Sequence, residues 1–321
     1  MNRLRAGILT LVCLLASAAR AGLPDMNWDP GAEECEPGQK HLQSHYFDEK
    51  TIILRQSLCI DFEANLLYLL IGKSRAMLVD TGASDDPQIA KLTADAVLDI
   101  LKLQGADLPL LVVHTHGHLD HRAGDVGFTS MKGAKIAPVE SEPLRKFFGF
   151  ADWPNDLAEI DLGDRVIDLI PTPGHHEDHI VFYDRKTRLL LTGDFLLPGR
   201  LLVQDIDAYR ASARRVADFV KTHPVDHVLG AHIELDAEGN LFPFGSTFHP
   251  NERAMALTAQ DVMALPAALA DFNGFYSRHA NFIVENPIHN LLAGAAGVIV
   301  ALVLLVWALR RWWKRRRLRT A

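Results

Sequence analysis

Apolar residues in the middle of the chain fall into short runs that predict strands, separated by stretches with helical spacing. The predicted strands cover residues 51–54, 66–71, 76–79, 110–113, 180–184, 189–192 and 225–229. The run at 110–113 is apolar throughout and ends in two valines, as expected of a strand covered on both faces. The runs at 180–184 and 189–192 are joined by a short polar segment, residues 185–187, which predicts a hairpin.

Three stretches have the spacing of helices. The apolar positions of the first two are Leu92, Ala96, Ile100 and Leu103, with Gly105 as a stop, and then Tyr209, Ala213, Val216 and Val220. Residues 259–276 predict a third helix, interrupted by Pro266. Because strands and helices alternate along most of the chain, the pattern predicts an α/β protein in layers, with its sheets covered by helices.

Both ends of the chain have patterns typical of membrane targeting. Residues 1–21 combine a charged start, an apolar stretch and an Ala-Arg-Ala sequence, which predicts a cleaved signal peptide, with an uncleaved anchor as the alternative. Residues 291–309 contain no charge. At about 1.5 Å per residue this run is about 28 Å long and matches a hydrocarbon core of about 30 Å, so it predicts a transmembrane helix.

The basic tail, residues 310–321, is expected to stay in the cytoplasm under the positive-inside rule. The chain is then a single-pass protein of the cell membrane, and residues 22–290 lie outside the cytoplasm, in the periplasm if the source is bacterial. Residues 22–49 are rich in Gly, Pro and acids and predict a lead-in to a folded domain over residues 50–290. In an oxidising compartment Cys35 and Cys59 can pair or remain two separate thiols.

The charge of the presumed folded part argues against a nucleic-acid partner. Residues 22–290 hold 23 Lys and Arg against 40 Asp and Glu, a formal charge of −17. Nucleic-acid binding depends on phosphate neutralisation by Lys and Arg. We therefore expect a small-molecule substrate, a membrane contact through the C-terminal helix and no nucleic acid. The sequence does not indicate an oligomeric state.

Four histidines and an aspartate lie within residues 114–121, directly after the predicted strand at 110–113. His116 and His118 are two residues apart, so an extended backbone points both rings to one side. Asp120 and His121 follow a turn and can face a second ion. Because each buried ring needs a hydrogen-bond partner, a purely structural role for so dense a cluster is disfavoured. The cluster predicts a metal site.

The stretch His116-x-His118-x-Asp120-His121 resembles the H-x-H-x-D-H signature of the metallo-β-lactamase superfamily. Four further motifs occur in the family's order, L-V-D-T-G at 78–82, T-P-G-H at 172–175, L-T-G-D at 191–194 and L-G-A-H at 229–232. The resemblance covers roughly residues 50–235. It implies a four-layer αββα sandwich of the metallo-β-lactamase type, to which the transmembrane helix is added.

The resemblance also implies a site for two divalent metal ions. It assigns His116, His118 and His175 to the first ion, Asp120, His121 and His232 to the second, and Asp194 to a bridge between them. Asp80 would orient ligands without binding metal. Imidazoles and carboxylates together suit Zn²⁺, with Fe or Mn as alternatives, and no organic cofactor is expected.

The implied activity is hydrolysis by water that the two cations activate, since bound metal lowers the pKa of water from 15.7 to about 7. Asp120 is the expected catalytic residue, because it can accept or shuttle a proton. True β-lactamases of this superfamily usually carry Cys or Ser at the position of Asp194, whereas thioesterases, lactonases and glyoxalase II-like enzymes keep Asp. We therefore expect cleavage of an ester, thioester, lactone or amide. The alternatives are a β-lactamase and a membrane-tethered metal-binding module without catalysis.

Other polar and aromatic residues near these motifs are expected to have supporting roles. His114 and His179 are expected to pack or to support the ligands, and His227 and His249 to be structural or on the surface. His176, Glu177 and Asp178 belong to the same loop as His175. Core packing is favoured over a pocket lining for the aromatic residues Phe242, Phe244 and Phe248.

Overall fold

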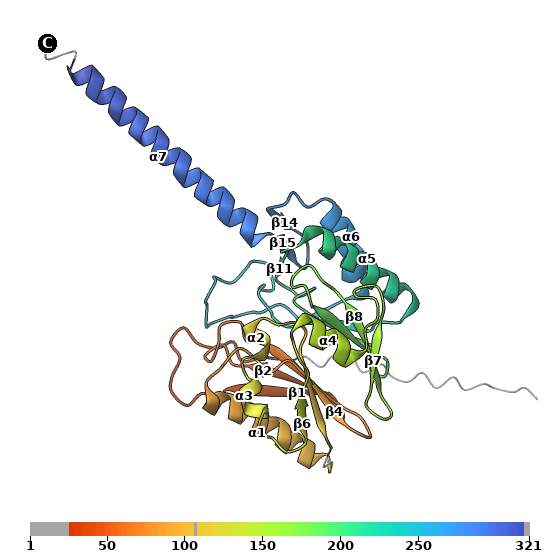
Figure 1. Ribbon diagram of the computed structural model, residues 1–321. Coiled ribbons are helices and arrows are strands. Elements are labelled where there is room, and N and C mark those ends of the chain that lie inside the picture. Colours follow the sequence, from red (N-terminus) through yellow and green to blue (C-terminus); the bar gives the residue numbers. More distant parts are fainter. Residues whose placement is uncertain (1–25, 106–107, 318–321) are drawn as a thin grey trace, which may run out of the picture.

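The computed structural model describes residues 26–105 and 108–317, so the predicted signal peptide lies outside the described residues. Two six-stranded sheets face each other, and helices cover their outer faces (Figure 1). The strand order is β1-β2-β3-β4-β5-β6 in the first sheet and β13-β12-β10-β9-β8-β7 in the second. A third, small sheet has the order β11-β15-β14 and lies next to the foot of α7.

The elements have the following bounds. The first sheet contains β1 (Leu42–Asp48), β2 (Thr51–Gln56), β3 (Leu66–Ile71), β4 (Ala76–Val79), β5 (Leu110–Val113) and β6 (Ala134–Ile136). The second contains β7 (Ala158–Asp161), β8 (Val166–Pro171), β9 (Ile180–Asp184), β10 (Leu189–Gly193), β12 (His227–Gly230) and β13 (Ala256–Leu257). The third contains β11 (Arg200–Leu202), β14 (Tyr276–Arg278) and β15 (Ile283–Glu285). The helices are α1 (Pro87–Leu103), α2 (Leu119–Arg122), α3 (Asp125–Phe128), α4 (Ser141–Phe148), α5 (Ile206–Thr222), α6 (Ala259–Ala270) and α7 (Pro287–Arg317).

Three hydrophobic cores hold these layers together. Successive side chains of a strand point to opposite faces, so Leu78 of β4 packs with Val97 of α1 on the outside of the first sheet. Its neighbour Val79 lies in the core between the sheets, together with Phe182 of β9. A third core, which includes Val216 of α5, lies between the second sheet and its helices. Strands buried on both faces explain the uninterrupted apolar runs, and the prediction of an α/β protein in layers is confirmed.

Each predicted strand is present, and β9 and β10 form the predicted hairpin. The stretch predicted as a lead-in differs, because it contains β1, which pairs antiparallel with β2 at the edge of the first sheet. The folded domain therefore begins before residue 50. The apolar stripe proposed for α1 is wrong at both ends, since Leu92 and Leu103 are 45% and 82% exposed. The helix instead buries a face that includes Ala90, Val97 and Leu101.

The third predicted helix is shorter than expected. It ends at Ala270 as α6, and the chain then turns into β14. The side-chain oxygen of Asn273 accepts hydrogen bonds from the backbone N–H groups of Phe275 and Tyr276, at 2.9 and 3.0 Å. Such a turn offers the backbone an alternative to helical hydrogen bonds and stops the helix.

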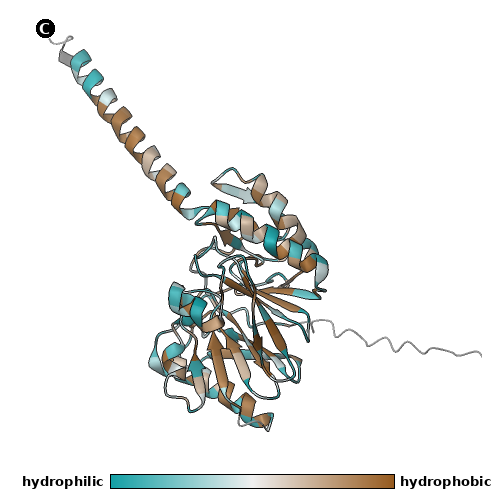
Figure 2. Cartoon of the chain, turned by 45° about the vertical axis from the view of Figure 1, so that its right-hand side comes forward, coloured by the Kyte–Doolittle hydropathy of each residue, from teal (hydrophilic) through white to brown (hydrophobic). Residues whose placement is uncertain are grey.

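α7 is longer than the predicted span of residues 291–309, because it begins at Pro287 and continues to Arg317. It is the one helix in the described part of the chain that is long and apolar enough to cross a membrane, and none of its apolar window is buried inside the protein. Figure 2 shows this apolar stretch projecting from the body.

A disulfide bond joins Cys35 to Cys59 across a sequence separation of 24 residues. It ties the segment before β1 to the loop that follows β2. Closing a loop of this size contributes about 3 kcal/mol in the chain-entropy account.

A buried ion pair ties β9 to the first sheet. The Arg165 guanidinium binds the Asp184 carboxylate at 2.5 Å, and both side chains are fully buried. It also donates to the carbonyl of Lys50 at 2.8 Å and to the hydroxyl of Thr51 at 2.7 Å. Removing the cation leaves a buried carboxylate unpaired. We expect Arg165→Ala to lower the free energy of unfolding by about 3–5 kcal/mol in denaturant titrations in detergent.

A matched control for this prediction is Lys186→Ala, which breaks the exposed ion pair with Asp164. Exposed pairs contribute little to stability, so no measurable change is expected. If Arg165→Ala unfolded at the same denaturant concentration as this control, the proposed role of the buried pair would be refuted.

Candidate metal centre

The predicted site residues come from loops at one end of the two sheets. The ligands follow β5 (His116, His118, Asp120 and His121), β8 (His175), β10 (Asp194) and β12 (His232), and Asp80 follows β4. The structure brings all seven predicted ligands together. The possible ligand atoms form one group from His116, His118 and His175 and a second from Asp120, His121, Asp194 and His232, and within each group they lie within 4.8 Å of one another.

In the first group, three ring nitrogens converge. His116 Nε2 lies 2.8 Å from His118 Nδ1 and 3.2 Å from His175 Nε2. His175 Nδ1 donates to the Leu202 carbonyl at 2.9 Å, so its Nε2 carries no hydrogen when the ring is neutral. Burial lowers the pKa of His116, and it lowers the pKa of His118 to about 4, so both rings are neutral at pH 7. Converging lone pairs repel unless a cation lies between them. Nitrogen ligands 2.0–2.1 Å from a tetrahedral ion are about 3.3 Å apart, so the spacing fits a metal.

In the second group, hydrogen bonds fix which nitrogen of each ring is free. His121 Nδ1 donates to the Asp80 carboxylate at 2.9 Å. His232 Nδ1 donates to the Glu63 carbonyl at 2.8 Å. The Nε2 atom of each neutral ring is therefore a bare acceptor directed at the site. This arrangement is typical of metal-binding histidines, whose second nitrogen is held by a carboxylate or a carbonyl.

These bare nitrogens face carboxylate oxygens. His121 Nε2 lies 2.8 Å from Asp120 Oδ2, and His232 Nε2 lies 3.3 Å from Asp194 Oδ1. His121 Nε2 and Asp194 Oδ1 are buried without a hydrogen-bond partner. Two acceptors in contact need a proton or a metal between them, so the donor set fits a divalent cation.

The electrostatics of the second group agree with this reading. Burial opposes the charged form of His121 and His232, but the Asp194 carboxylate and its neighbours outweigh it and raise the pKa of both rings. Burial likewise opposes ionisation of Asp194, but the two rings lower its pKa. Without metal the rings therefore hold protons, which a bound cation would displace.

Asp194 lies between the two groups. Its Oδ2 is 3.4 Å from His175 Nε2 of the first group, and its Oδ1 is 3.4 Å from His121 Nε2 of the second. The preceding residue, Gly193, has φ +50°, and a Cβ there would lie 2.7 Å from the side chain of Thr115. Glycine therefore lets the end of β10 approach the loop after β5. The two oxygens of one carboxylate therefore face the two groups of ligand atoms.

Asp80 supports the centre from outside the ligand set, as predicted. Its carboxylate accepts hydrogen bonds from Thr115 N at 2.8 Å, from Thr115 Oγ1 at 3.0 Å and from His121 Nδ1 at 2.9 Å. These three groups donate to both oxygens of Asp80, so only a carboxylate can accept from all of them. We expect Asp80→Asn to weaken metal binding about 10–100-fold, because its amide turns a donor toward these groups. Titration against a competing chelator measures this.

The control for Asp80→Asn is Asp125→Asn, which alters a similar Asp–His pair that contains no ligand. Asp125 lies 2.9 Å from His114 Nε2. Its substitution is expected to change metal affinity less than about threefold. Equal effects of the two substitutions would show that Asp80 has no special role. The His114 contact also agrees with the expected packing role of that ring.

The loop that carries His175 is held by α4 and by its own side chains. The Asp178 carboxylate accepts from Ser141 Oγ and from Arg145 Nη2, the latter at 2.9 Å. His179 is fully buried, and its Nδ1 lies 2.7 Å from the hydroxyl of Thr172. These contacts fit the expected supporting role of His179. Asp178 was expected only to lie near the site, and the structure shows that it fixes the loop.

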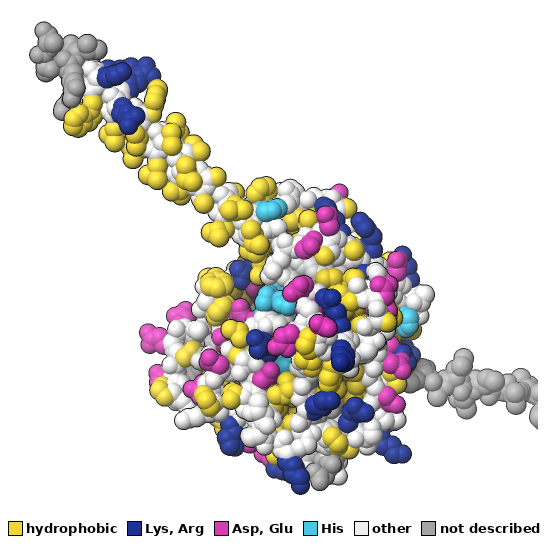
Figure 3. All heavy atoms as spheres, in the orientation of Figure 1, with side chains coloured by type: hydrophobic (Ala, Val, Ile, Leu, Met, Phe, Trp, Pro, Cys, Tyr) yellow, Lys and Arg dark blue, Asp and Glu magenta, His cyan; other side chains and the backbone are white. Residues whose placement is uncertain are grey.

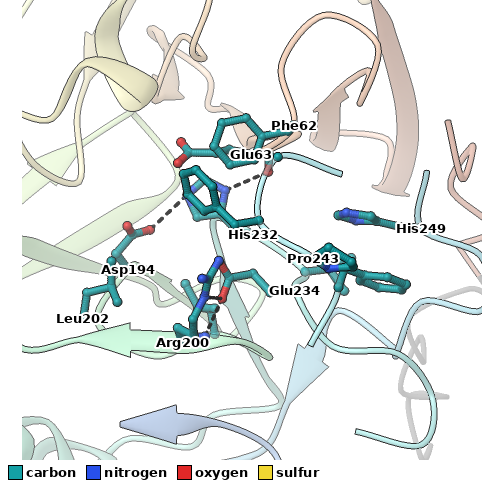
Figure 4. A pocket seen from close by; sticks show the side chains of 14 residues that line it. Phe62, Glu63, Asp194, Arg200, Leu202, His232, Glu234, Pro243 and His249 are labelled. Atoms are coloured by element: carbon teal, nitrogen blue, oxygen red, sulfur yellow. Dashed lines mark hydrogen bonds and ion pairs between the residues drawn. The ribbon is translucent and has the colours of Figure 1, made fainter. Parts of the chain in front are cut away.

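A pocket opens onto the second group (Figure 4). Asp194 and His232 lie on one side of it, and Phe62 and Phe244 form an apolar rim with ring centroids 4.8 Å apart. Phe244 is 77% exposed, so the expectation that this ring packs in the core is wrong. The neighbouring Phe242 also lines the pocket.

Sequence reasoning missed three residues of this pocket. Phe62 and Glu63 lie in the loop after β2, and Arg200 lies at the start of β11, where its guanidinium pairs with the Glu234 carboxylate at 2.7 Å. Burial raises the pKa of Glu63 to about 7. None of them belongs to a motif. The other pocket histidine, His249, is buried and stacks on a neighbouring phenylalanine, which agrees with its expected structural role.

A family model and several known proteins match this sequence. The sequence model described as "Metallo-beta-lactamase superfamily" matches residues 60–232. A beta-lactamase-like protein 2 homolog of Drosophila melanogaster is 30% identical in an alignment 168 residues long, which covers 47% of this chain and 53% of that protein. The chain thus spans about half the length of that relative.

Two further relatives have names that specify an activity. The acyl-coenzyme A thioesterase MBLAC2 of Homo sapiens is 24% identical in an alignment 219 residues long, which covers 57% of this chain and 77% of that protein. A hydroxyacylglutathione hydrolase of Cereibacter sphaeroides is 30% identical in an alignment 154 residues long, which covers 46% of this chain and 58% of that protein. Among solved structures, a metallo-beta-lactamase from Pontibacter korlensis has a TM-score of 0.49 at 16% identity, over 72% of this chain and all of that one.

Proposed function

The chain belongs to the metallo-β-lactamase superfamily, and we propose that it is a hydrolase that holds two divalent cations, with Zn²⁺ the expected metal and Fe or Mn the alternatives. Its substrate is an ester, thioester, lactone or amide. The observation that carries this proposal is the position of Asp194, whose two oxygens face the two groups of ligand atoms.

Each group of residues has its own proposed role in the site. His116, His118 and His175 would hold one cation, Asp120, His121 and His232 the other, and Asp194 both. The bound cations would polarise the substrate carbonyl and lower the pKa of a water.

Asp120 is the group placed to take up the proton of the attacking water. Its side chain is 24% exposed, more than that of Asp194 at 13%, so it reaches the open side of the site. Burial opposes its ionisation, but the rings of His121 and His232 lower its pKa, so it is a carboxylate at neutral pH. His175 and His232 are held in place by backbone carbonyls and keep the site rigid.

The reaction class is supported by the relatives. One is named an acyl-coenzyme A thioesterase and another a hydroxyacylglutathione hydrolase. An aspartate at position 194 fits this group better than the β-lactamases, in which Cys or Ser is usual. Thioesters and esters are therefore the first substrates to test.

The same proposal places the chain in a membrane. α7 crosses the bilayer, with residues 291–309 as the span and the basic tail, residues 310–321, in the cytoplasm. Residues 1–21 act as a signal peptide, so the metal centre lies on the extracytoplasmic side. Support comes from the length and composition of α7 and from the absence of burial along its apolar window.

The decisive experiment measures metal content and turnover on the same preparation. We expect about two transition-metal ions per chain, and hydrolysis of at least one class among thioesters, esters, lactones and cephalosporins. Chelation should remove activity, and added Zn²⁺ should restore it. Two bound metals without turnover of any class would favour a binding module, and turnover of cephalosporins alone would favour a β-lactamase.

A further inference from the structure

One strand pair links the metal centre to the foot of α7. His175, a proposed ligand, is held by the carbonyl of Leu202 at the end of β11. The parallel partner of Leu202 in β15 is Glu285. Adjacent strands are about 4.8 Å apart, and α7 begins only two residues after Glu285. The carbonyl that holds His175 and the start of α7 therefore lie close together.

The first turn of α7 is fastened to the body. His289 Nδ1 donates to the carbonyl of Gly274 at 2.8 Å. Asn290 Nδ2 donates to the carbonyl of Phe275 at 3.2 Å and to the Glu285 carboxylate at 3.0 Å. The apolar part of α7 then starts at Leu291, less than about 20 Å from Leu202 by strand spacing, chain length and helix rise. With α7 in a bilayer, the metal centre cannot lie far from the lipid surface.

Apolar side chains surround the foot of α7. Phe275, Tyr276 and Ile288 are 45%, 43% and 51% exposed. Figure 3 shows apolar side chains where α7 meets the body. Aromatic side chains are typical of the membrane–water interface. This end of the domain is therefore suited to rest on the bilayer.

One ring of the pocket's apolar rim, Phe244, lies beside the same strand pair. Arg200 of β11 pairs with Ile283 of β15, and its guanidinium lies 5.8 Å from the centre of the Phe244 ring. The start of the Phe244 loop is tied to the segment after β12, because the backbone N–H of Phe242 donates to the carbonyl of Glu234 at 3.0 Å. The exposed Phe244 ring and the neighbouring Phe62 ring give the edge of this polar site an apolar surface on which an apolar group can lie.

The charge near this rim argues against an anionic head group. Arg200 is already paired with Glu234. The whole of residues 22–290 has a formal charge of −17, which repels anionic lipids. An uncharged or zwitterionic amphiphile meets neither obstacle.

We propose that the substrate is a membrane-held acyl ester or thioester, whose apolar chain lies on Phe62 and Phe244 and whose carbonyl reaches the metal centre from the bilayer side. This inference rests on the proposed hydrolase function. In the reaction, the hydroxyl of water joins the acyl carbon and the acyl–oxygen or acyl–sulfur bond breaks. The remaining hydrogen goes to the departing alcohol or thiol.

The test uses the full-length, metal-loaded chain in phosphatidylcholine vesicles, with two reporters that share one leaving group. These are p-nitrophenyl palmitate, dissolved in the vesicles, and p-nitrophenyl butyrate, in solution. We expect kcat/KM for palmitate to exceed that for butyrate at least about tenfold, because the longer chain buries more apolar surface. Phe244→Ser should lower this ratio about fivefold or more, since it removes the apolar rim.

Two further variants separate the membrane route from simple apolar binding. A flexible spacer of twelve Gly and Ser residues between Asn290 and Leu291 keeps the foot contacts but lets the body move about 20 Å from the bilayer; it should lower the palmitate-to-butyrate ratio and leave butyrate turnover unchanged. The control is Leu103→Ser, which removes an 82% exposed leucine of α1, at the far end of the body from α7, and should leave the ratio unchanged (Figure 1).

Each contrary result has a distinct meaning. If neither reporter were hydrolysed, this inference would fail, and turnover of thioesters, lactones and cephalosporins would decide the hydrolase function separately. Hydrolysis of butyrate with a ratio near one, insensitive to Phe244→Ser, would overturn the inference and leave the hydrolase function standing. A ratio that falls in Phe244→Ser but not with the spacer would overturn the membrane route. Faster palmitate turnover in phosphatidylglycerol vesicles would overturn the argument that the negative charge of residues 22–290 disfavours anionic lipids.

Discussion

Asp194→Asn is expected to abolish hydrolysis and to reduce the bound metal to at most one ion per chain. Asp194 presents one oxygen to each group of ligand atoms, 3.4 Å from His175 Nε2 and 3.3 Å from His232 Nε2. An amide supplies one oxygen and no charge, so it cannot face both positions as an acceptor. Two divalent cations a few ångströms apart also need an anion between them to offset their repulsion.

The expected loss of kcat/KM is at least about 10³-fold, because metal ions supply several kcal/mol of transition-state stabilisation and each 1.4 kcal/mol is worth a factor of ten. Metal content by mass spectrometry and thioester or ester turnover are measured together. The matched control is Asp205→Asn in the loop before α5, where the side chain caps the helix by accepting from Asp207 N and Ala208 N. Asparagine caps helices as well as aspartate, so this variant should keep both metal ions and full activity.

Two outcomes would contradict the assignment of Asp194. Retention of two metal ions in Asp194→Asn, with activity within about tenfold of the unaltered chain, would remove the bridging role. An equal loss in Asp205→Asn would show that the effect comes from the fold of this region. Circular dichroism of both variants separates a local loss of metal from unfolding.

The ligands were predictable because each lies in a short motif, and most of these motifs follow an apolar run. His116 and His118 follow β5, whose four residues are all buried, and Asp194 follows the equally buried β10. A strand covered on both faces is visible in the sequence as an unbroken apolar run, and the residue after it lies at the edge of the sheet. The resemblance of these motifs to those of the family then assigned each residue to a group.

The walls of the pocket were not predictable in the same way. Arg200 reaches the pocket because β11 pairs with β15, which is far away in sequence. Phe62 reaches it because its loop follows Cys59, and the disulfide holds that loop to the segment before β1. No local pattern reports such contacts.

The strand β8 was not predicted for another reason, because Asp168 interrupts its apolar run. In the structure Arg185 pairs with the Asp168 carboxylate at 2.5 Å, and this ion pair offsets the cost of burying the charge.

A chain that ends at Asn290 is expected to leave the membrane fraction. None of the apolar window of α7 is buried inside the protein, so its removal takes away no core and leaves the sandwich folded. The segment removed begins at Leu291, which is 75% exposed, as is typical of a surface meant for lipid. A helix of this length inserts almost irreversibly. The full-length chain should therefore remain with membranes after an alkaline wash, and the shortened chain should appear in the supernatant with its metal content unchanged.

A chain that ends at Leu309 is the control for this truncation, because it loses the basic tail and keeps the apolar segment. It should stay in the washed membranes.

The mass of the chain that ends at Asn290 shows whether residues 1–21 are a cleaved signal peptide or an uncleaved anchor. If residues 1–21 are removed, the mass lacks them and nothing apolar is left to hold the chain. If the shortened chain kept these residues and stayed in the membrane, the N-terminal segment would be an anchor, and the metal centre would be tethered from the opposite end of the sequence. If it lacked them and still resisted the wash, α7 would not be the anchor, and the route proposed for the substrate would lose its basis.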